Sequence, residues 1–83
     1  MSTFNNAERQ AALHVGATML RERFPTSLKC HASFSLLSVK LTYTVFAAFG
    51  WPGVVRVTMR DTGQFIAQSL PGQPFELDPG VHA

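Results

Sequence analysis

The alternation of apolar and polar residues over positions 28–45 reverses its phase once, which predicts a β-hairpin. Apolar side chains occupy even positions as far as Phe34 and odd positions from Val39 onward. Because successive side chains on a strand point to opposite faces, pairing Phe34 with Val39 collects the apolar residues on one face of a sheet. The same register pairs Ala32 with Leu41, Cys30 with Tyr43 and Leu28 with Val45.

This register places Leu36 and Leu37 in a four-residue loop at the tip of the hairpin. Glycine, asparagine and aspartate are the usual residues at such positions, because they adopt turn conformations easily. Two leucines at a loop tip are therefore unusual, and we expect them to contact a partner.

An N-terminal helix is predicted over residues 6–23. Asn5 followed three residues later by Glu8 has the spacing of a capping box, and Pro25 disfavours helical geometry at Phe24. Gly16 interrupts an apolar stripe, which indicates close packing of the helix on a sheet. The apolar stripe consists of Ala12, Val15, Met19 and Leu20.

The alternating pattern continues into further strands. The turn Asp61-Thr62-Gly63 is typical of a three-residue hairpin loop, and it pairs Met59 with Phe65 and Val57 with Ala67. Prolines and glycines interrupt the chain after residue 70, so residues 71–83 are expected to form an extended tail. The predicted strands cover about residues 28–35, 38–49, 54–60 and 64–70.

Together these elements predict a single α+β domain over residues 1–83. It has two layers, an N-terminal helix packed on a four-stranded antiparallel meander sheet. The helix covers the apolar face, and the other face is open.

The net charge of +2 is unevenly distributed, because no acidic residue lies between Glu22 and Asp61. The open sheet face is consequently expected to be basic and rich in hydroxyls, with Phe46 and Ile66 as apolar islands. Cations and hydroxyls suit phosphate contacts, and an aromatic ring can stack on a base, so nucleic-acid binding is one candidate function. The residues assigned to that function are Lys29, His31, Lys40, Arg56 and Arg60.

No motif indicates catalysis, a cofactor or a metal. Cys30 and His31 are neighbours on a predicted strand and point to opposite faces, so they cannot form a nucleophile and base pair. The histidines lack metal-ligand spacing, and the carboxylates form no pair that could act as acid and base. We therefore expect a non-enzymatic protein without cofactors or metals.

Apolar residues near predicted turns favour a protein-binding module instead, because clustered exposed aromatics commonly mark contact sites. Self-association as a homodimer fits the low content of charged residues and the free sheet edges. A single cysteine favours the cytoplasm, and no segment resembles a signal peptide or a membrane span. An accessory regulator or inhibitor fits this description of a protein-binding module. The residues assigned to protein binding are Leu36, Leu37, Phe46, Phe49 and Trp51.

Overall fold

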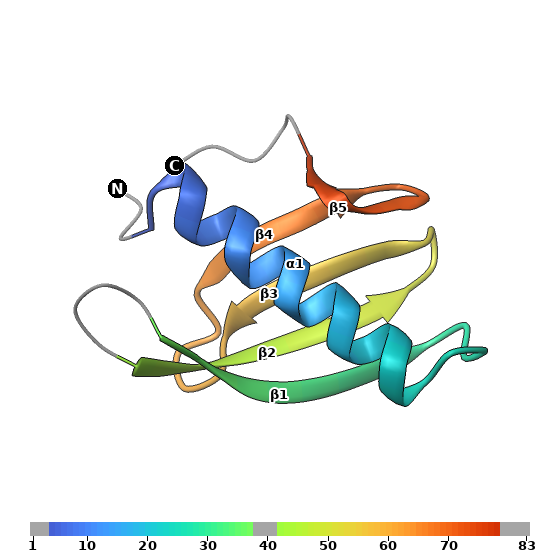
Figure 1. The fold of residues 1–83 in the computed structure, drawn as a ribbon, viewed down its shortest axis with the longest axis horizontal. Coiled ribbons are helices and arrows are strands. Elements are labelled where there is room, and N and C mark those ends of the chain that lie inside the picture. The colour runs from blue at the N-terminus through green and yellow to red at the C-terminus, as the bar shows by residue number, and fades with distance from the viewer. Residues whose placement is uncertain (1–3, 38–41, 79–83) are drawn as a thin grey trace.

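The computed structural model describes residues 4–37 and 42–78, and these form a helix packed on an antiparallel sheet (Figure 1). The five strands follow one another across the sheet in chain order. The expected α+β arrangement is confirmed, whereas the expected count of four strands is wrong. The elements are α1 (Asn6–Arg23), β1 (Cys30–Leu37), β2 (Thr42–Gly50), β3 (Val54–Met59), β4 (Phe65–Leu70) and β5 (Gln73–Leu77).

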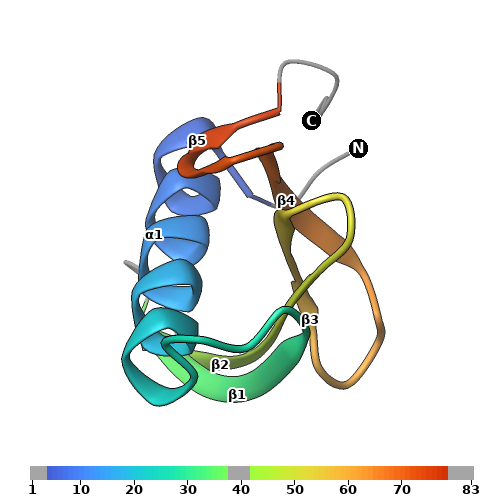
Figure 2. The same ribbon diagram turned by 90° about the vertical axis from the view of Figure 1, so that its right-hand side faces the viewer.

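The sheet curls around one side of the helix. In Figure 1, α1 crosses the sheet diagonally, from β4 and β5 at its start to β1 at its end. Figure 2 shows β5 at the upper part of the helix and β1 and β2 beside its lower end, and all five strands contact α1. Among the described residues, no helix combines the length and the apolar character needed to cross a membrane.

The start and the end of α1 follow from local sequence. The Asn5 side chain accepts a hydrogen bond from the Glu8 backbone N–H at 2.8 Å, and the Glu8 carboxylate accepts one from the Asn5 N–H at 3.1 Å. At the other end, the Phe24 N–H donates to the Leu20 carbonyl at 2.8 Å, after which Pro25 prevents a further helical turn. The capping box and the helix end predicted from the sequence are both confirmed.

The apolar face of α1 differs from the predicted stripe. Val15 is 36% exposed and Met19 is half-buried, so the buried face is rotated toward neighbouring positions. At Gly16 the helix approaches the sheet closely: a Cβ there would lie 3.1 Å from both the Ala47 Cβ and the Val57 Cγ1. The buried positions of the helix's apolar face are Ala12, Leu13, Gly16, Ala17 and Leu20.

The register between β1 and β2 is also different from the predicted one. Phe34 pairs with Val45 rather than with Val39, and β1 continues through Leu36 and Leu37. The shift is an even number of residues, so each side chain keeps the face that the sequence predicted. Alternation cannot distinguish registers that differ by an even shift. The observed one places the small residues Ala32 and Ala47 opposite each other, and Ala47 is one of the residues that α1 approaches closely at Gly16.

Because of a bulge in β4, part of the register between β3 and β4 differs from the predicted one. Val57 pairs with Ala67 as expected, but Thr58 rather than Met59 lies opposite Phe65, and the register shifts between Val57 and Thr58. The extra residue, Ile66, turns into the core, where it is 1% exposed. Phe65 is 40% exposed, so it replaces Ile66 on the outer side of the sheet.

The fifth strand lies in the segment that was expected to be an extended tail. Gly72 has a φ of 75°, which lets the chain turn back after β4 so that β5 pairs with it. Pro74 lacks a backbone N–H but is tolerated because β5 is an edge strand. Phe75 packs against α1, with its ring 4.9 Å from the His14 ring and 5.3 Å from the Arg21 guanidinium carbon. These helix contacts fix a segment whose own sequence has weak strand propensity.

Candidate functional site

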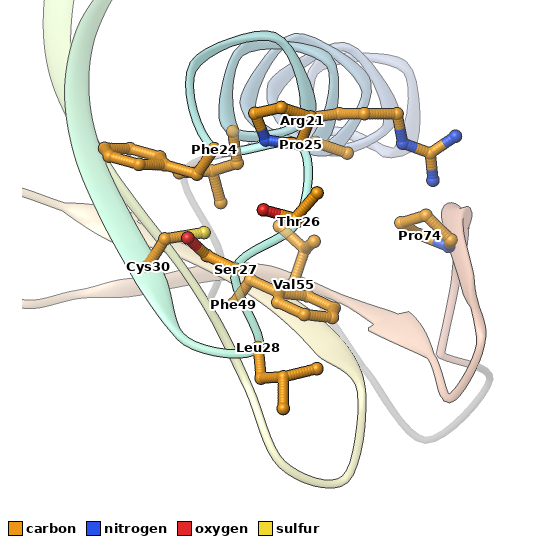
Figure 3. A pocket seen from close by; sticks show the side chains of 12 residues that line it. Arg21, Phe24, Pro25, Thr26, Ser27, Leu28, Cys30, Phe49, Val55 and Pro74 are labelled. Atoms are coloured by element: carbon orange, nitrogen blue, oxygen red, sulfur yellow. The ribbon is translucent and has the colours of Figure 1, made fainter.

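An open pocket lies between the C-terminal end of α1 and the sheet (Figure 3). Its volume is about 280 Å³. Figure 3 shows side chains of the helix end and the following loop facing Cys30, Phe49 and Val55 of the sheet across the cavity. The residues that line it are Ala17, Leu20, Arg21, Phe24, Pro25, Thr26, Ser27, Leu28, Cys30, Phe49, Val55 and Pro74.

The loop between α1 and β1 makes this pocket. Because Pro25 ends the helix, the chain leaves α1 and turns toward the sheet, with the Ser27 N–H donating to the Phe24 carbonyl at 3.3 Å. The loop side chains are exposed: Phe24 is 38% exposed and Leu28 is 87% exposed. The loop therefore presents apolar side chains to solvent at the mouth of the pocket.

Trp51 lies on the same edge of the molecule. It occupies the turn between β2 and β3 and is 95% exposed. The β1–β2 register pairs Cys30 with Phe49, and Leu28 and Trp51 each lie two residues beyond this terminal pair, at the same end of the two strands. We call this group, Phe24, Leu28, Trp51 and the pocket beside them, the apolar end.

The charges on the segments that flank the apolar end are basic except for Glu22, which is exposed on the last turn of α1. Arg21 lines the pocket, and Arg23 and Lys29 are exposed on the flanking segments. Burial raises the pKa of the Cys30 thiol above its ordinary value of 9.0. The thiol therefore stays protonated at neutral pH. It contributes a largely apolar surface to the pocket rather than a reactive thiolate.

The outer face of the sheet, on the side away from α1, forms a second candidate surface. Two rows of directly paired residues cross it from β1 to β4. In the row from Ser33 to Phe65, Phe46 and Phe65 stand on either side of Thr58. The neighbouring row consists of His31, Ala48, Arg56 and Gln68.

Side-chain contacts link these two rows. The His31 and Phe46 rings lie 5.4 Å apart, and the Arg56 guanidinium carbon lies 5.6 Å from the centre of the Phe65 ring. The Arg56 Nε also donates to the Gln68 Oε1 at 3.1 Å. The outer face thus carries two aromatic rings and one guanidinium in direct contact with a ring.

The residues predicted for protein binding lie in different parts of the fold. Leu36 and Leu37 are the last two residues of β1 and not a loop tip; Leu36 is half-buried and Leu37 is 78% exposed. Phe46 points to the outer face. Phe49 lines the pocket and Trp51 lies two residues further on, in the turn after β2, so of the five residues these two belong to the apolar end.

The residues predicted for nucleic-acid binding are also separated. His31 and Arg56 share one row of the outer face, whereas Arg60 lies in the exposed turn after β3, where its N–H donates to the Thr44 carbonyl at 3.1 Å. Lys29 precedes β1 and is exposed. Lys40 lies outside the described residues.

Sequence reasoning missed Leu28 and Phe24 at the apolar end. The predicted register gave Leu28 a core position opposite Val45, whereas the observed one leaves it outside the strand. One signal was present: Pro25 close behind the helix indicates a loop, and the apolar residues Phe24 and Leu28 lie on either side of it.

Comparison of the chain with family models, with curated proteins and with solved structures finds no match. Within residues 4–37 and 42–78, no group of three or more histidine, cysteine, aspartate or glutamate side chains could hold a metal ion.

Proposed function

We propose that this chain is a small non-enzymatic protein-binding module, which acts by docking an apolar segment of a partner protein on its apolar end. The observation that carries the proposal is the exposure of two large apolar side chains: Leu28 (87%), which lines an open pocket, and Trp51 (95%), which follows the pocket residue Phe49 by two positions. Exposed aromatic side chains next to a pocket are typical of the anchors that dominate protein interfaces. An accessory regulator or inhibitor would work in this way, and the thiol of Cys30 fits a reducing compartment such as the cytoplasm.

The size of the pocket favours a side chain as its occupant. At about 280 Å³ it lies at the lower limit of the volumes that hold drug-sized ligands. An aromatic or branched aliphatic side chain fits such a space, with Trp51 and Leu28 covering the adjacent backbone. A partner that buried either of these side chains would gain about 1.5–3 kcal/mol from each.

The charge pattern indicates that acidic residues flank the anchor in the partner. Arg21 lines the pocket and Arg23 and Lys29 lie on the segments that flank it, where Glu22 is the one acidic residue before Asp61. Complementary charges speed association and orient the bound segment. The proposed occupant is therefore an apolar segment with acidic neighbours.

Selection from a random peptide library displayed on phage tests this proposal. Selected peptides should share an aromatic or branched aliphatic residue near acidic ones. Trp51 is the single tryptophan of the chain, so its fluorescence emission should shift to shorter wavelength as a synthetic peptide covers it.

Two variants then locate the binding site. The double variant Leu28→Ser/Trp51→Ser should weaken peptide binding at least tenfold in fluorescence anisotropy with a labelled peptide, because about 1.4 kcal/mol corresponds to a factor of ten. The matched control is Leu37→Ser, which removes another exposed leucine at the opposite end of β1. Equal weakening by both variants, or no selected peptide at all, would reject the proposal.

A second candidate function, nucleic-acid binding by the outer sheet face, is favoured by one specific observation. The β4 bulge adds Phe65 to Phe46, so two aromatic rings are available for stacking, with Arg56 against one of them. Arg56→Glu/Arg60→Glu should then abolish binding of single-stranded oligonucleotides, and wild-type affinity should fall steeply with salt. Wild-type protein that gives no mobility shift at about 50 mM salt, where electrostatic binding is strong, would eliminate this function.

A further inference from the structure

The two edges of the sheet differ in how they are protected. At one edge, β5 has only five residues, contains Pro74 and Glu76, and is held by the contacts of Phe75 with α1. A short strand, a proline and a charge are the features by which proteins keep an edge from pairing with another chain.

The other edge, β1, has none of these features. It is eight residues long, contains no proline and no charged residue, and pairs with β2 over its whole length without a register shift. Because β1 is the first strand in the sheet order, the backbone groups on its outer side have no partner strand among the described residues (Figure 1). A long, regular and uncharged edge is a template for a further strand.

The side chains of β1 are partitioned between its two faces. Residues that face α1 are apolar, and two of them, Phe34 and Leu36, are only half-buried. On the outer face, His31, Ser33 and Ser35 are small or polar, and Leu37 at the end of the strand is the apolar exception. An added strand must present the same division of faces, and β1 itself is such a strand.

We propose that β1 pairs antiparallel with β1 of a second copy of this chain, about a two-fold axis that passes through Ser33. Two five-stranded sheets then join into one continuous sheet of ten strands, with both helices on the same face. An isologous contact of this kind closes on itself and needs only one surface patch.

This axis gives a pairing of complementary sizes. On the face toward α1, small Ala32 lies opposite large Phe34 of the other copy, and small Cys30 lies opposite Leu36. Alternation of small and large side chains across facing positions fills space well. On the outer face, His31 lies opposite Ser35 and Ser33 opposite its own copy, so no like charges meet.

The proposed dimer goes beyond the proposed function, because it uses the edge of β1 and leaves Leu28 and Trp51 unused; of the paired residues named here, Cys30 also lines the pocket. A dimer would carry two apolar ends, and a partner with two docking segments could then engage both with increased overall affinity.

Sedimentation velocity from low micromolar to several hundred micromolar protein tests the dimer. Wild-type protein should reach twice the 9.1 kDa mass of one chain as its concentration rises. Ser33→Lys places two like charges directly opposite each other at the axis and should raise the dissociation constant at least tenfold. The control Thr44→Lys adds the same charge to the outer face of β2, away from the edge, and should leave the mass unchanged.

A cross-link tests the register. Ser33→Cys, in a chain that also carries Cys30→Ala, should form a disulfide-linked dimer on mild oxidation, whereas the same chain with Thr44→Cys in place of Ser33→Cys should not. A mass of one chain at every concentration would overturn the proposal, as would a dimer that Ser33→Lys leaves intact. A dimer that is lost in Leu28→Ser/Trp51→Ser but kept in Ser33→Lys would also overturn it, by placing the contact at the apolar end. Peptide binding by Ser33→Lys protein measures the proposed function separately.

Discussion

Ser69→Ala should destabilise this protein strongly for so small a change. Ser69 is fully buried on β4, and its hydroxyl oxygen accepts a hydrogen bond from the Val55 N–H of β3 at 2.8 Å. Val55 itself is 2% exposed, so water cannot replace the lost acceptor. An unpaired buried N–H costs about 1–3 kcal/mol, and the free energy of unfolding should fall by that amount.

The loss is measurable by thermal and urea unfolding followed by circular dichroism. In a domain of this size, about 1 kcal/mol lowers Tm by about 4–8 °C. The control Ser35→Ala removes a hydroxyl from an exposed position on the outer face and should change the free energy of unfolding by less than about 0.5 kcal/mol. Hydrogen exchange provides a local measurement, because the Val55 amide should lose protection. A Ser69→Ala protein as stable as Ser35→Ala, with the Val55 amide equally protected, would refute the reasoning.

Two further predictions concern the core. Gly16→Val should lower the free energy of unfolding by about 1–3 kcal/mol more than the control Ala11→Val does. A Cβ at Gly16 would lie 3.1 Å from side chains of β2 and β3, whereas Ala11 is exposed. Equal losses of stability in urea unfolding would contradict the close approach of the helix to the sheet. Tyr43→Phe should not destabilise the protein at neutral pH, because the buried hydroxyl has no hydrogen-bond partner among the described residues. Burial, with a smaller contribution from Glu8, raises the pKa of Tyr43 above its ordinary 10.0, so only the unfolded chain ionises there near that pH. Wild-type stability should therefore fall as pH rises above about 10, and the decline should be smaller in Tyr43→Phe; parallel declines from about pH 8 to 11 would contradict it.

The candidate site was predictable only in part. Trp51 and Phe49 could be assigned to a contact surface because aromatic residues cluster beside the turn signal Gly50-Trp51-Pro52-Gly53. Leu28 could not, since its exposure depends on where β1 begins, and that depends on the register with β2. Phe65 was assigned to the core for a similar reason: a single extra residue in β4 reverses the faces beyond it.

Local signals in the sequence determined the ends of the helix and the face of each residue that the structure shows paired between β1 and β2. The Asn5 and Glu8 capping box, Pro25 and the alternation of β1 and β2 act within a few residues, so their effects can be derived without knowledge of the rest of the chain.

Contacts between distant residues decided the remainder. Alternation permits every even shift of the β1–β2 register equally, so it cannot select one of them. The observed register accompanies the close approach of α1 to the sheet at Gly16. The fifth strand depends on the packing of Phe75 against α1, which compensates for the proline in β5. The pocket and the unprotected β1 edge exist only because the helix, the loop and the curled sheet meet as they do, and no local pattern specifies that meeting.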